Sequence, residues 1–220
     1  MAVFFQRLLN VRRDELLPVL LSALLFFCIL TALMLLRPAR EALGMQRGIE
    51  AVRWLFIGTA LATLLVNPLF GLLVSWLRRL AFIAVVYGFF ALSLLAFYLV
   101  MVLAPGAIGV ASGQVFYVWF SVFNLFSTMV FWALMADRFS LEQSKRFFGV
   151  IAVGGTCGAI AGPALASLLA APLGTPALLL VSTGLLLAAI GLIRLLARFA
   201  PAGCGAAAAP RIGGSAWEGL

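Results

Sequence analysis

Residues 16–36 read LLPVLLSALLFFCILTALMLL and contain no charge, and residues 37–44 read RPAREALG. A hydrocarbon core about 30 Å thick requires about 20 apolar helical residues, so the first run is long enough to cross a membrane. Arg37, Arg40 and Glu41 then follow within about one helical turn of one another. Charges at the end of a span can be snorkelling anchors, or they can form an anion site. Both interpretations are open at this point.

The composition of the whole chain is that of an integral membrane protein. Of its 220 residues 65% are hydrophobic and only 10% are charged, and the mean hydropathy is +1.19. The long apolar runs contain no basic residue, so the net charge of +8 indicates topology rather than nucleic-acid binding. No histidine occurs, and the three cysteines are far apart in the sequence. We therefore expect no metal site, no cofactor and no enzymatic activity.

Uncharged runs predict an all-α, polytopic bundle of six transmembrane helices. The run from 80 to 136 is long enough for two crossings and is broken at Ala104-Pro105-Gly106, and the run from 147 to 193 is broken between Ala171 and Pro176. We expect a cytoplasmic amino end at 1–15 and a disordered cytoplasmic tail at 197–220, on either side of a transmembrane domain at 16–196. The predicted spans are about 16–36, 54–77, 80–103, 113–136, 148–171 and 176–196.

The distribution of basic residues predicts the orientation. Eleven lie on the side that holds both termini and four on the opposite side, which places both termini in the cytoplasm. The four exceptions are Arg37, Arg40, Arg47 and Arg53, all in the segment after the first span. Because they lie on the side that is poor in basic residues, topology does not explain them, and this favours the anion site.

Two predicted spans carry polar residues on one helix face. In the second span Thr59, Thr63 and Asn67 recur every four residues. In the fourth span five residues step by 3, 4, 3 and 4. These residues are Gln114, Tyr117, Ser121, Asn124 and Thr128. Such faces either hydrogen-bond between helices or line a path for a solute, and the pattern allows both.

Two further motifs concern the fifth span. Gly154, Gly158 and Gly162 lie on one face and would let another helix approach closely, so packing is the favoured interpretation. Residues 140–143, Ser-Leu-Glu-Gln, have the form of a capping box and predict a short helix before Lys145 and Arg146.

Several patches resemble the nucleotide (ATP/ADP) translocases of intracellular bacteria and plastids, a family related to the major facilitator superfamily. They are residues 37–44 after the first span, Phe116 to Trp119 in the fourth, and Phe131 to Ala133 leading into 140–148. In that family a basic residue followed by an acid closes the first span and is implicated in nucleotide transport, and Arg40 and Glu41 occupy that place here. Ser121 stands where the family carries a glutamate.

The resemblance implies a six-helix bundle equivalent to the amino-terminal half of a facilitator-type transporter in a bacterial inner membrane. It would exchange an organic anion such as a nucleotide, with Arg40 contacting the anion, Arg37 assisting and Glu41 holding the guanidinium in place. The expected substrate-binding residues are Arg37, Arg40, Glu41, Asn67, Gln114, Tyr117, Ser121 and Asn124.

A partner and an alternative function complete these expectations. One half leaves its polar faces uncovered, so we expect the chain to need a second six-helix half or a second copy in the lipid bilayer, and not to transport by itself. The alternative is a membrane interaction or assembly protein that recruits a partner through the glycine face of the fifth span, or a truncated, inactive transporter fragment.

Overall fold

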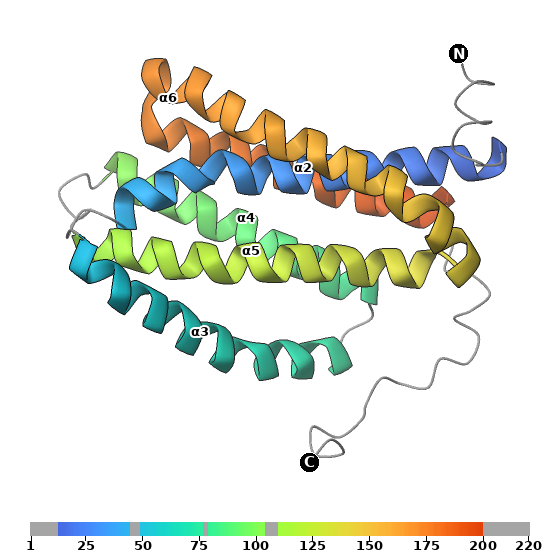
Figure 1. Cartoon of the computed structure of the whole chain (residues 1–220), viewed down its shortest axis with the longest axis horizontal. Helices are drawn as coiled ribbons and strands as arrows, with labels where there is room; N and C mark the ends of the chain where they lie inside the picture. The colour runs from blue at the N-terminus through green and yellow to red at the C-terminus, as the bar shows by residue number, and fades with distance from the viewer. Residues whose placement is uncertain (1–12, 45–48, 77–78, 104–109, 200–220) are drawn as a thin grey trace.

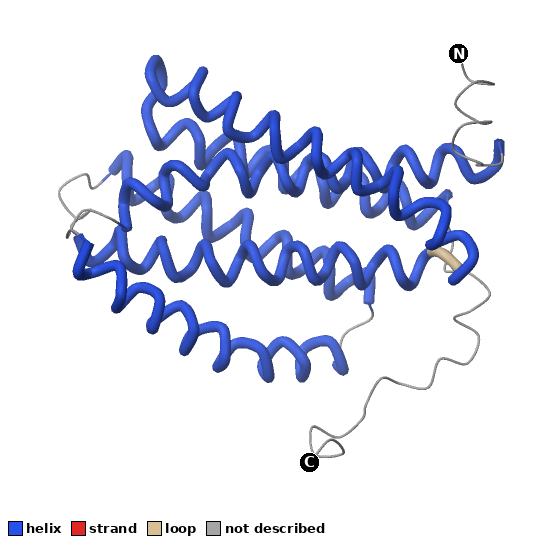
Figure 2. Tube along the Cα trace, in the orientation of Figure 1, coloured by secondary structure: helices blue, strands red, loops and turns tan. Residues whose placement is uncertain are grey.

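The computed structural model describes residues 13–44, 49–76, 79–103 and 110–199, and these form a bundle of helices with no strand among them (Figure 1, Figure 2). The helices are α2 (Arg13–Gly44), α3 (Ile49–Trp76), α4 (Arg79–Leu103), α5 (Val110–Arg138) and α6 (Leu141–Phe199). Four of them, α2, α4, α5 and α6, are long and apolar enough to cross a membrane. The prediction of an all-helical fold typical of a membrane protein is therefore confirmed for the described residues.

α6 consists of two arms. Its 59 residues would extend about 90 Å if straight, three times the thickness of a hydrocarbon core. The backbone leaves the helical conformation at Gly174, where φ is 74° and ψ is 175°, a region that glycine adopts without the clash of a Cβ. Figure 1 shows the chain reversing there, so that the two arms run side by side. The predicted turn lies at the right place but is narrower than expected, because helix continues through residues on either side of Gly174.

Helix ends differ from the prediction at two places. α2 continues through Gly44, so Arg37, Arg40 and Glu41 lie on its last turns instead of in a loop that follows Leu36. The capping box is confirmed, since the Ser140 amide donates to Gln143 Oε1 (3.1 Å) and the Gln143 amide donates to Ser140 Oγ (3.3 Å). It begins the long helix α6 rather than a short one, because no breaker follows Arg146 before Pro163. The predicted amino end (1–15) and tail (197–220) lie largely outside the described residues.

α2 is the central helix and the most buried of the four candidate spans. The first arm of α6 lies against it through the predicted glycine face, where a Cβ on Gly158 would come 2.5 Å from the Phe27 carbonyl oxygen. The second arm contacts it as well, since Ser182 Oγ donates to the Ala32 carbonyl oxygen (3.1 Å). On the α5 side the Phe26 ring stacks on Phe131. The prediction that the glycines serve helix packing is therefore confirmed, and the face is covered by α2 instead of being open to a partner.

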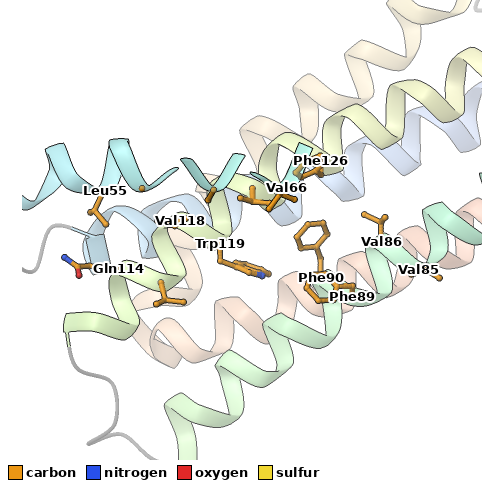
Figure 3. Close-up of a pocket in the computed structure, with 14 residues that line it drawn as sticks. Leu55, Val66, Val85, Val86, Phe89, Phe90, Gln114, Val118, Trp119 and Phe126 are labelled. Carbon is orange, nitrogen blue, oxygen red and sulfur yellow. The ribbon is translucent and has the colours of Figure 1, made fainter. Parts of the chain in front are cut away.

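α3 lies at the edge of the bundle and packs mainly on α5 and to a lesser extent on α4 (Figure 1). A cavity of about 920 Å³ lies between these three helices. Its lining is almost entirely apolar, with Val66 from α3, Phe90 from α4 and Trp119 from α5 among the contributors (Figure 3). This side of the bundle is more open than the side on which α2 meets α6.

Candidate functional site

The structure brings four of the predicted site residues together where the end of α2 meets α5. Arg40 Nη1 donates to Glu41 Oε1 at 2.7 Å, and Nη2 donates to Ser121 Oγ at 3.1 Å. The central carbon of the guanidinium lies 3.8 Å from the centroid of the Tyr117 ring, which is a close cation–π contact. We refer to Arg40, Glu41, Tyr117 and Ser121 as the arginine cluster.

Two glycines allow α2 and α5 to approach closely at the arginine cluster. A Cβ on Gly113 would lie 2.8 Å from the Leu43 carbonyl oxygen, and a Cβ on Gly44 would overlap the Tyr117 ring. Since such separations are below normal contact distance, any other residue would push the helices apart. The predicted fourth span began at Gly113, but the sequence analysis did not assign it this role. The sequence did contain a signal for this close approach, namely one glycine at the end of α2 and another near the start of α5.

The guanidinium is held mainly by neutral groups. Ser121 Oγ donates its own proton to the Tyr117 carbonyl oxygen (2.9 Å), which leaves its lone pairs to accept from Arg40. Tyr117 is buried and supports one face of the guanidinium. The Arg40 side chain is only 17% exposed, whereas that of Glu41 is 40% exposed, and Arg40 Nε is buried without a hydrogen-bond partner. The arrangement is a preformed, planar cation with spare donor capacity, which suits an oxyanion.

The other predicted site residues lie elsewhere. Arg37 and Asn124 are exposed, and Gln114 lines one end of the apolar cavity (Figure 3). Asn67 is also exposed and directly follows Val66, which lines the same cavity as Gln114. The predicted polar face of α5 is therefore divided: Tyr117 and Ser121 meet α2, whereas Asn124 does not take part in the cluster.

A second polar cluster, which the sequence interpretation missed, ties the start of α2 to the start of α6. Glu15 Oε1 accepts from Gln143 Nε2 (3.1 Å) and from Arg146 Nη2 (3.2 Å). In the sequence these three residues are separate charged or capping residues. Glu15 is 128 residues from Gln143 and 131 residues from Arg146, and no local pattern indicates that they meet. Glu15 connects the two helices whose glycine contact lies farther along α2.

Among the described residues, no group of three or more histidine, cysteine, aspartate and glutamate side chains is placed to hold a metal ion. Within these residues the chemistry that the arginine cluster can perform is recognition of an anion by charge and hydrogen bonds.

Comparison with known proteins gives no match to a family model, a curated protein or a solved structure. The resemblance to the nucleotide translocases therefore stays a prediction, and the functional argument depends on the geometry of the arginine cluster.

Proposed function

We propose that this chain is a six-helix half of a secondary transporter that exchanges an organic anion such as a nucleotide, and that Arg40 binds the anion. The observation that carries the proposal is the position of the Arg40 guanidinium. A snorkelling arginine extends its charge to water. Arg40 instead folds back onto Tyr117 and is 17% exposed. An ionisable group withdrawn from solvent in a membrane bundle is costly, and it is commonly a functional group.

The proposal counts six crossings by adding two to the four apolar helices. It includes α3, which contains the uncharged run from Trp54 to Trp76, and it counts α6 twice, once on either side of the reversal at Gly174. With α2, α4 and α5 these give six. The proposal also places the protein in a bacterial inner membrane with both termini in the cytoplasm, and the distribution of basic residues supports this orientation.

A partner is part of the proposal. Asn67 and Asn124 are exposed on helices α3 and α5. Amide groups in contact with hydrocarbon are unfavourable, and a second six-helix half or a second copy would cover them. The alternative of an assembly protein loses its proposed docking surface, since α2 already covers the glycine face of α6.

The experiment is to measure ADP and phosphate binding by calorimetry on the purified, detergent-solubilised protein, and exchange of the same ions after reconstitution with its partner or as the oligomer that it forms. We expect Arg40→Ala to lower ADP affinity by about 100-fold and Arg40→Lys by about 10-fold, because an ammonium lacks the planar fork of a guanidinium. Arg194→Ala is the matched control, since Arg194 is exposed on the second arm of α6. Equal ADP affinity in the wild type and Arg40→Ala, or no binding at all by the wild type, would reject the proposal.

A further inference from the structure

We propose that Glu41 is a displaceable internal counter-ion: its carboxylate occupies the place on Arg40 that an anionic ligand takes, and binding exchanges the one for the other. This inference rests on the proposed function of Arg40. It gives Glu41 the role of a competitor, whereas the sequence had suggested that Glu41 holds the guanidinium in place.

The orientation of Arg40 does not depend on Glu41. Tyr117 supports one face of the guanidinium at 3.8 Å, and Ser121 accepts from Nη2 at 3.1 Å. Both residues belong to α5, which Gly44 and Gly113 hold close to α2. A guanidinium that is fixed by a buried ring and a hydroxyl keeps its position when the carboxylate leaves.

Glu41 is placed so that it can leave. Glu41 is the residue next to Arg40 on the same helix, so no helix–helix interface holds its carboxylate against the guanidinium. Adjacent residues of a helix do not normally face each other, and other rotamers would turn the Glu41 side chain away from Arg40. Its side chain is 40% exposed, more than twice the exposed fraction of Arg40. A carboxylate this exposed regains water when it swings away, and this lowers the cost of breaking the 2.7 Å contact.

An internal competitor also selects the class of ligand. The Glu41 carboxylate is attached to the neighbouring residue and therefore has a high effective concentration at Arg40. A free monocarboxylate would make the same interaction as Glu41 but would also lose translational freedom on binding, so it should compete poorly. A phosphoryl group carries more charge and a third acceptor oxygen. Arg40 has donor capacity to match it, because the bonds to Glu41 and Ser121 use only one N–H of Nη1 and one of Nη2. The cluster should therefore bind phosphoryl-bearing anions and reject monocarboxylates.

The test compares the binding of ADP and of acetate to the purified protein by calorimetry, in the wild type and Glu41→Gln. The glutamine keeps the size of the side chain but removes the competing charge. We expect Glu41→Gln to bind ADP about 10-fold more tightly than the wild type and to gain measurable acetate binding, which the wild type lacks. Glu142→Gln is the control, because Glu142 is exposed at the opposite end of the bundle and should leave both affinities unchanged.

The possible outcomes separate the two proposals. Weaker or unchanged ADP binding by Glu41→Gln, with binding still lost in Arg40→Ala, would overturn the counter-ion and leave Arg40 as the anion site. Loss of the Arg40 effect itself would overturn both. If Glu41→Gln does not fold, Glu41→Asp serves instead, since the shorter carboxylate should compete less well and bind ADP about threefold more tightly than the wild type; no tightening there would likewise overturn the counter-ion.

Discussion

α2 makes two close approaches to its neighbours, and both depend on glycine, but they lead to different results. Toward α6 three glycines, Gly154, Gly158 and Gly162, meet the α2 backbone or its first side-chain atoms on consecutive turns. Toward α5 the glycine-dependent approach is confined to one corner, where Gly44 and Gly113 make room for the Arg40 guanidinium over Tyr117. A glycine face that extends over several turns holds two helices together, whereas a glycine pair at the helix ends positions a charge.

The two regions also differ in what a substitution should change. Along the α2–α6 contact the partners are backbone and apolar atoms, so a disturbance should appear as lost stability. At the arginine cluster the partners are a cation, a ring, a hydroxyl and a carboxylate, so a disturbance should appear first as changed anion binding.

The largest effect is expected from Gly158→Leu, which breaks the α2–α6 contact. A Cβ alone would lie 2.5 Å from the Phe27 carbonyl oxygen, and a leucine cannot be accommodated without separating the helices. We expect a loss of about 3 kcal/mol or more in stability, measured as the thermal or denaturant unfolding of the protein in detergent. Gly191→Leu is the control, because nothing lies within 4 Å of a Cβ at that exposed position. Equal unfolding of the two variants would show that the glycine face contributes no close packing.

A smaller effect is expected from Gly113→Ala, which widens the α2–α5 corner. The added Cβ would lie 2.8 Å from the Leu43 carbonyl oxygen and should shift Arg40 relative to Tyr117 and Ser121. We expect ADP affinity to fall about 10-fold, with a stability loss of about 1 kcal/mol. Gly88→Ala, where a Cβ would meet nothing within 4 Å, should change neither quantity. Lowered stability with unchanged ADP binding would mean that the corner packs the bundle but does not position Arg40.

The smallest effect on ADP affinity is expected from substitution of Tyr117, which tests the cation–π contact with Arg40 within the arginine cluster. Tyr117→Leu removes the aromatic face beneath the guanidinium, and a cation–π contact of this kind contributes about 1 kcal/mol, so ADP affinity should fall about fivefold. Tyr117→Phe keeps the ring and should stay within about twofold of the wild type. If calorimetry finds the leucine and phenylalanine variants alike, the ring does not support the bound state of Arg40.

The sequence indicated the main residues of the arginine cluster, but it did not separate them from other polar residues nearby. The placement of Arg40 and Glu41 against the distribution of basic residues singled out the end of α2, and the polar period of α5 singled out Tyr117 and Ser121. The same period also included Gln114 and Asn124, which lie outside the arginine cluster. A helical period gives the direction of a side chain on its own helix, but the rotation of that helix against its neighbours decides which residues meet.

The sequence by itself determined that this protein is made of long apolar helices, that α6 reverses near Gly174, and that α6 starts at a capping box. These features depend on local rules: the length of an uncharged run, the freedom of glycine at positive φ, and a side chain that caps its own helix. Only the tertiary structure decided that Arg40 meets Ser121, 81 residues away, and that Glu15 meets Arg146. The physical reason is that such pairs depend on how closely and at what rotation two helices pack, and that is determined by glycines and side chains far apart in the chain.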